Sequence, residues 1–207
     1  MPGRFVLRRH PALRRLLAAN VVSAAGDWLT YVAVGVLALR GSGGGLVDVA
    51  LVQLAHTVPQ VSSAPLAGWL SDRVDRRTLI VAASAARGLL TLAMAVAAWR
   101  DALGLVELLL VLRMAAAAFV ATPTSALVPR LVAARDVGEA HAVFGVAWAV
   151  VFTAGVALGG VVSALVGPVV ALAADAITFF VAAYLAAGVE VPPAREERRP
   201  ARAAIGA

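Results

Sequence analysis

The chain has no cysteine and no lysine, and only 14% of its 207 residues are charged. The absence of cysteine excludes disulfides, thiolate metal sites and cysteine nucleophiles. The three histidines, His10, His56 and His141, lie far apart in the sequence, so we expect no metal site. Soluble domains carry about 25% charged residues, and this chain has too few to cover a water-exposed surface.

Sequence motifs of several catalytic classes are also missing. The chain has no G-x-x-x-x-G-K-[ST] phosphate loop, no G-x-S-x-G elbow and no H-E-x-x-H pair. We therefore expect no ATP hydrolysis by this chain, no enzymatic activity and no cofactor.

Apolar residues, in contrast, make up 61% of the chain, and the mean hydropathy is +0.88. A soluble domain of this length cannot bury that much apolar surface, whereas a helix bundle in lipid can leave it facing hydrocarbon. The composition therefore predicts an all-α, polytopic membrane protein whose apolar surface contacts membrane lipid.

Six stretches are long enough to cross the bilayer, because a span needs roughly 20 mostly apolar residues. They are predicted at 16–39, 46–70, 78–98, 103–122, 139–164 and 168–188. Residues 41–45 are predicted to form a flexible turn and 123–136 an interfacial stretch. The domain plan is a basic N-terminal segment at 1–15, a six-helix domain at 16–189, and a disordered tail or linker start at 190–207. The first span is too long for the core of a cleaved signal peptide and carries Asp27 in its middle.

The arginines set the predicted orientation, because Lys and Arg in short loops collect on the cytoplasmic side. With the N-terminus inside, the inner segments hold Arg4, Arg8, Arg9, Arg14, Arg15, Arg73, Arg76, Arg77, Arg130, Arg135, Arg195, Arg198, Arg199 and Arg202. The outer loops hold only Arg40 and Arg100. This asymmetry predicts a cell-membrane protein with both termini in the cytoplasm. It also explains the isoelectric point near 11.3 without nucleic-acid binding.

One segment, from Gly68 to Arg77, crowds a glycine, two aspartates and three arginines between two spans. The glycine allows a neighbouring helix to approach closely. Asp72 can pair with an arginine, and the arginines can form bidentate ion pairs across the cytoplasmic mouth. We interpret the segment as an ionic latch that breaks when the inner gate opens. Its residues are Gly68, Asp72, Arg73, Arg76 and Arg77.

This segment resembles G-x-L-[AS]-D-R-x-G-R-[KR], the loop motif between the second and third helices of the major facilitator superfamily. It departs at Asp75, where that family usually has glycine, and the extra acid is expected to give the arginines a second partner. Further segments resemble the superfamily's drug and siderophore exporter branch: Asn20 to Trp28, Ala126 to Val132, Glu139 to Ala142 and Asp175 to Phe179. The likeness runs from about residue 11 to 188 and implies transport of a small-molecule substrate.

Two of the charged residues within the predicted spans are the main functional candidates. A charge at mid-span costs about 2.5–3.5 kcal/mol on insertion scales, so it usually faces a cavity or a partner. Asp27 is either a proton acceptor or cationic-substrate contact, or a packing residue satisfied by Asn20, Ser23 or Thr30. Arg113 needs a carboxylate partner, for which we expect Asp27. We therefore place Asn20, Asp27 and Arg113 at one aqueous cavity.

The stretch Leu109-x-x-x-Arg113 resembles the superfamily's fourth-helix motif, which implies a role for the arginine in proton transfer. Ala116 and Ala117 depart from the glutamine and glycine often found there. For Arg87, anchoring toward the inner interface is favoured over a role in coupling. Asp175 is left open between a cavity acid and a structural hydrogen-bonding residue.

The fifth predicted span carries closely spaced glycines that suit helix packing. They are Gly155, Gly159 and Gly160. The run resembles the antiporters' G-x-x-x-G-P-x-x-G-G motif but has Val151 for its first glycine and Val156 for its proline, so we interpret it as a packing surface.

The resemblance implies one six-helix half of a transporter, the N-terminal one. Such transporters bind substrate between two halves, so we expect a second half in the same or a separate chain. The leading function is proton-coupled efflux of small amphipathic or hydrophobic compounds. The alternative is a non-transporting membrane subunit or a degenerate transporter remnant. The membrane domain of an ATP-driven exporter ranks lower, because the long cytoplasmic helix extensions are missing.

Overall fold

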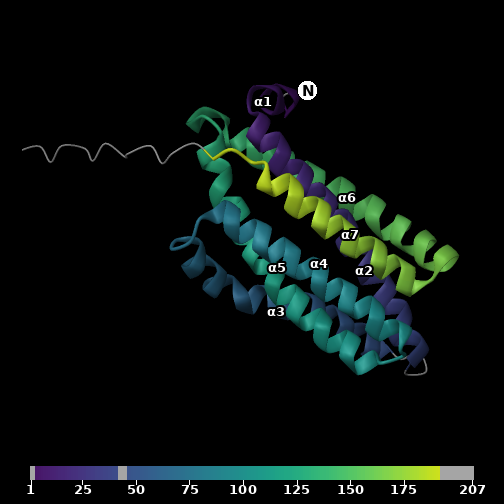
Figure 1. The fold of residues 1–207 in the computed structure, drawn as a ribbon. Coiled ribbons are helices and arrows are strands. Elements are labelled where there is room, and N and C mark those ends of the chain that lie inside the picture. Colours follow the sequence, from purple (N-terminus) through teal and green to yellow (C-terminus); the bar gives the residue numbers. More distant parts are fainter. Residues whose placement is uncertain (1–2, 42–45, 192–207) are drawn as a thin grey trace, which may run out of the picture.

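The computed structural model describes residues 3–41 and 46–191, and every regular element in these ranges is a helix (Figure 1). The helices are α1 (Gly3–Arg9), α2 (Pro11–Gly41), α3 (Leu46–Ser71), α4 (Arg76–Trp99), α5 (Leu103–Leu131), the short 3-10 turn η1 (Ala134–Asp136), α6 (Val137–Val166) and α7 (Pro168–Ala187). The predicted turn at 42–45 and most of the predicted tail, residues 192–207, lie outside the described ranges.

Five of these helices are long and apolar enough to cross a membrane. They are α2, α4, α5, α6 with its preceding turn, and α7. This confirms a polytopic helical membrane protein. The expected span at 46–70 does form a helix, α3, but Gln53, His56 and Gln60 lower its hydropathy and it is not among the five. A sixth span remains a prediction.

The expected interfacial stretch at 123–136 is largely helical, so that prediction is wrong. Helix α5 continues to Leu131 and contains Pro123 and Pro129. A proline inside a membrane helix can be tolerated where neighbouring helices pack against the chain. Here Leu127, Val128 and Leu131 are buried in the apolar core, and this packing holds the last two turns of α5 in place.

The helices pack in a pattern with internal symmetry. Helix α7 packs against α2 and α4, α5 packs against α3 and α4, and α6 packs against α2. Exchanging α2 with α5, α3 with α6 and α4 with α7 reproduces the same set of pairs. Figure 1 shows the resulting groups, α2 with α6 and α7, and α5 with α3 and α4. The first three long helices and the last three are therefore arranged as a repeat.

The apolar core is divided into two clusters by a polar layer. One cluster contains Leu16, Ile80, Leu127 and Ala182, and the other contains Val34, Met94, Leu110 and Leu172. The buried charged residues of α2, α4 and α7 lie between these positions along their helices. Large apolar side chains such as Leu165 and Ile177 are exposed on the outside. This distribution suits a bundle surrounded by lipid, with its polar groups turned inward.

Candidate functional site

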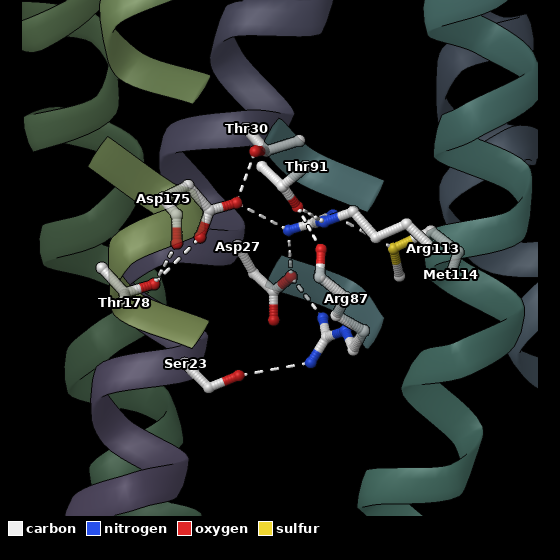
Figure 2. A network of polar contacts seen from close by, with 9 residues as sticks. All are labelled: Ser23, Asp27, Thr30, Arg87, Thr91, Arg113, Met114, Asp175 and Thr178. Atoms are coloured by element: carbon white, nitrogen blue, oxygen red, sulfur yellow. Dashed lines mark hydrogen bonds and ion pairs between the residues drawn. The ribbon is translucent and has the colours of Figure 1, made fainter. Parts of the chain in front are cut away.

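Four charged side chains from four helices form a continuous chain of ion pairs in the polar layer (Figure 2). Arg87 Nη2 of α4 lies 2.6 Å from Asp27 Oδ1 of α2. Arg113 Nη2 of α5 lies 2.6 Å from the same oxygen and 2.9 Å from Asp175 Oδ2 of α7. With all four groups ionised, the two positive and two negative charges balance.

Hydroxyl groups donate to or accept from these charged side chains. Arg87 Nη1 donates to Ser23 Oγ at 3.2 Å, and Arg113 Nε donates to Thr91 Oγ1 at 3.0 Å. On the other side, two threonines donate to Asp175: Thr30 Oγ1 at 2.5 Å to Oδ2 and Thr178 Oγ1 at 3.0 Å to Oδ1. The side chains of Arg113 and Asp175 are fully buried. Burial of such charges is tolerated because each has a partner and further hydrogen bonds.

The ring of Phe179 contacts both guanidinium groups. The Cζ atoms of Arg87 and Arg113 lie 4.3 and 4.9 Å from the centroid of Phe179 in α7. A cation over a ring face is attracted by the ring quadrupole, and the attraction is stronger where water is excluded. Phe179 therefore adds to the stability of both buried cations.

A cavity of about 280 Å³ reaches this network from one side. Asp27 and Arg87 lie at its wall, and the side chain of Asp27 is 24% exposed. The remaining wall consists of Asn20, Ser23, Ala24, Trp28, His56, Gln60, Met114, Ala117, Val120, Ala121 and Trp148. Of the two carboxylates in the ion-pair network, Asp27 is thus the one that lies at the cavity wall.

Two of the three predicted cavity residues, Asn20 and Asp27, line the cavity. Arg113 contacts Asp27 as expected, but its side chain is fully buried and does not line the cavity, contrary to the prediction. The prediction that Arg87 anchors toward the inner interface is wrong, because its side chain is 4% exposed and bonded to Asp27. Asp175 is a full member of the network. The argument that identified Arg113, that a charge at mid-span needs a partner or a cavity, applies equally to Arg87.

The predicted latch contains fewer ionic contacts than expected. Arg76 Nη2 lies 3.4 Å from Asp72 Oδ1, but the Asp72 side chain is 73% exposed, so solvent weakens the pair. The same arginine donates from Nη1 to the carbonyl of Ala126 in α5 at 2.9 Å. Arg73 stacks on Trp69 at 3.9 Å, and Arg77 is exposed. Arg76 is therefore the latch residue that links the loop to another helix.

Contrary to expectation, Asp75 forms no ion pair with an arginine of the described residues. It is the N-cap of α4, and its Oδ2 accepts from the amide nitrogen and the hydroxyl of Thr78, both at 2.8 Å. These hydrogen bonds hold the pKa of the Asp75 carboxyl below its usual value of 3.8. Its φ of −56° is open to any residue, so the glycine that the superfamily motif has here is not required.

Two of the four candidate packing glycines lie in close helix contacts. A Cβ on Gly155 would lie 2.7 Å from Trp28 Cδ1, and one on Gly159 would lie 2.9 Å from the Trp28 carbonyl oxygen. A Cβ on Gly160 would meet nothing within 4 Å, so its predicted packing role is wrong. A Cβ on Gly68 would meet only Thr122 Cγ2, at 4.0 Å, so no close approach depends on it.

Among residues 3–41 and 46–191, no three histidine, aspartate or glutamate side chains are grouped as metal ligands would be. The buried carboxylates instead pair with arginines and threonine hydroxyls.

Comparison with known proteins gives a consistent result. A segment of 84 residues, which is 41% of this chain, is 32% identical to an uncharacterized MFS-type transporter, YfiS, of Bacillus subtilis (strain 168). The aligned segment covers 20% of that relative. No solved structure matches the chain. These similarities point to a transporter rather than an enzyme. The profile of the family described as transmembrane secretion effector (MFS_3) matches residues 4–204, and the chain belongs to this family of the major facilitator superfamily.

Proposed function

We propose that the chain is the N-terminal six-helix half of a proton-coupled secondary transporter that exports small amphipathic or hydrophobic compounds. The observation that carries the proposal is the position of Asp27, which bridges Arg87 and Arg113 while facing the cavity. Such a group can respond both to protons and to a substrate at the same wall.

Protonation of Asp27 provides the coupling step. The carboxylate joins α2 to α4 through Arg87 and to α5 through Arg113. Once it is neutral, Arg87 has lost its ion-pair partner and Arg113 retains Asp175 alone. Two helix contacts are then weakened at once, so proton binding favours a different packing of α2 against its neighbours. Alternating access follows from that change in packing.

The helix arrangement supports a half transporter. The exchange of α2–α4 with α5–α7 is what a 3+3 inverted repeat requires, and superfamily members combine two such units around a midplane site. Helix α3 then serves as the sixth span: its 26 residues extend about 39 Å at 1.5 Å per residue. A second six-helix unit, in the same or a separate chain, closes the cavity.

The orientation is proposed with the loop at 72–75 in the cytoplasm and the loop at 100–102 outside the cell membrane. The absence of cysteine makes this directly testable with single-cysteine variants. Val74 and Trp99 are both exposed. In intact cells, an impermeant maleimide should label Trp99→Cys but not Val74→Cys, and permeabilised cells should label both. Labelling of Val74→Cys in intact cells would overturn the orientation.

Transport is tested in everted membrane vesicles that contain the chain, with a set of fluorescent amphipathic dyes and an imposed proton gradient. Asp27→Asn should abolish gradient-driven dye uptake, whereas Asp101→Asn, in an exposed loop, should leave it unchanged. Gradient-driven uptake that persists with the same pH profile in Asp27→Asn would show that Asp27 does not couple protons.

The same preparation separates the alternative, a non-transporting subunit or remnant. A transporter unit should give dye flux above that of control vesicles, and native electrophoresis in mild detergent should reveal a partner half or a dimer. A stable assembly without any flux would favour the subunit.

A further inference from the structure

An aromatic track crosses the cavity side of three helices. Trp148 and Phe152 of α6 stack with centroids 5.3 Å apart, and Phe152 meets Trp28 of α2 edge-on at 4.7 Å. Trp28 contacts Tyr31 at 5.5 Å, and Tyr31 contacts His56 of α3 at 5.2 Å. We call these five residues the aromatic track.

The track continues directly into the cavity wall. Trp28, His56 and Trp148 line the cavity, so its two ends and its centre face the same space. Trp148 and Phe152 are 57% and 42% exposed. Ring faces exposed beside a cavity suit the stacking of a planar ligand, because offset and edge-on aromatic pairs are favourable beyond their area burial.

Two nitrogen atoms at this cavity have no hydrogen-bond partner within the described residues. They are His56 Nε2 and Arg87 Nε, both buried atoms of residues that line the cavity. The Arg87 side chain is itself almost fully buried. A buried polar atom without a partner is unfavourable, so these positions are suited to a ligand that satisfies them. Arg87 Nε can only donate, and His56 Nε2 can donate as one tautomer. Both nitrogen atoms can therefore donate a hydrogen bond to an acceptor on a ligand.

The charges of the site disfavour a cationic ligand. Asp27 already accepts from two guanidinium groups, and Asp175 balances the second of them. A cation brought to Asp27 would also approach Arg87 and Arg113, and their repulsion offsets its attraction to the carboxylate. An organic cation is therefore expected to bind less well than a neutral compound of the same shape.

From these observations we propose that the cavity binds a neutral, planar aromatic compound that carries a hydrogen-bond acceptor. Its ring lies against Trp28 and Trp148, and its acceptor faces His56 and Arg87. The cavity volume of about 280 Å³ suits one or two fused rings. The inference rests on the proposed transport function, since it names the substrate class of the same cavity.

Equilibrium dialysis of the purified full chain in lipid nanodiscs, against nanodiscs without protein, tests this with three probes of similar shape. Quinoline is neutral above its pKa and has a ring-nitrogen acceptor. N-methylquinolinium is a cation without the acceptor. Naphthalene is neutral and has no acceptor. At pH 8, quinoline should bind about tenfold more tightly than N-methylquinolinium and about fivefold more tightly than naphthalene.

Three variants tie the binding to the named residues. Trp148→Leu should weaken quinoline binding about tenfold, and His56→Phe about fivefold while leaving naphthalene unchanged. Trp99→Leu is the matched control, because this exposed tryptophan lies at the far end of α4 from the cavity, and it should change nothing. Circular dichroism and gel filtration establish that each variant is folded.

Three results would overturn the inference: no quinoline binding above that of empty nanodiscs, unchanged affinity in folded Trp148→Leu, or tighter binding of N-methylquinolinium that is lost in Asp27→Asn. Failure of the proposed function is a separate observation. Quinoline binding as described, together with unaltered proton-driven flux in Asp27→Asn vesicles, would leave the ligand class standing and remove the proton coupling.

Discussion

Gly26 of α2 and Asp175 of α7 are in direct contact, and the Asp175 carboxylate occupies the space that a side chain at position 26 would need. A Cβ built on Gly26 would collide with Asp175 Oδ1 and with Thr178 Oγ1. The glycine therefore allows α7 to approach α2 closely enough for Asp175 to reach Arg113. Gly26 directly precedes Asp27. The same turn of α2 therefore contributes the Asp27 carboxylate to the network and leaves room for the Asp175 carboxylate.

Gly26→Ala is expected to destabilise the fold by about 1–3 kcal/mol, because an added methyl group in a filled contact forces the backbone or side chains to shift. Gly35→Ala on the same helix is the control, since a Cβ there meets nothing within 4 Å. It should be neutral or stabilising by up to about 1 kcal/mol. Unfolding of the detergent-solubilised protein measures both, and equal effects of the two substitutions would contradict the close contact.

The ion pair between Asp27 and Arg87 is expected to show strong coupling. Asp27→Asn leaves a buried guanidinium without its carboxylate and should cost about 3–5 kcal/mol of unfolding free energy. The double variant Asp27→Asn/Arg87→Gln removes both charges and should be more stable than the sum of the single effects by about 1–3 kcal/mol. A double-mutant cycle on unfolding free energies measures this, and additive effects would show that the two side chains do not interact.

Two glycines on different faces of α6 are expected to differ in how substitution by alanine changes the stability of the fold. Gly155→Ala places a methyl group against Trp28 and should destabilise by about 1–3 kcal/mol. Gly160→Ala, on the exposed side of the same helix, has open space and should be neutral or slightly stabilising. Thermal unfolding of the two variants side by side tests which face of α6 packs against α2. The reverse order would mean that the helix is rotated.

The cap of α4 by Asp75 is expected to weaken in acid. Because Thr78 lowers the pKa of this carboxyl in the folded protein, its stabilising effect is present above pH 3.8 and is lost as the pH falls further. Asp75→Ala should cost about 0.5–2 kcal/mol at neutral pH, and Asp75→Asn much less, since asparagine also caps helices. Hydrogen exchange at the Thr78 amide against pH reports the loss directly. A Thr78 amide that exchanges equally fast in wild type and Asp75→Ala would exclude the cap.

The membrane class and most helix positions follow from local sequence. A long apolar run must be helical in lipid to satisfy its own backbone, so each predicted span, including 46–70, coincides with a helix. The boundaries fail where tertiary packing intervenes. The predicted span ended at residue 122, but burial of Leu127 and Leu131 accompanies a helix α5 that continues to Leu131.

The pairing of Asp27 with Arg113 was predictable because a buried charge needs a partner and few candidates lie at mid-span. The cost of a mid-span charge also marks Arg87 as a candidate, but only the packing of α4 and α7 shows that Arg87 and Asp175 join the same network.

The sequence by itself therefore determined that this protein spans a membrane, that its chain is helical, and which side chains are costly to bury. The tertiary structure decided which of those side chains meet, which glycines contact a neighbouring helix, and which side chains line the cavity. The physical reason is range: hydrophobicity and helix formation act along the chain, whereas ion pairs and close packing depend on residues far apart in the sequence, such as Asp27, Arg113 and Asp175.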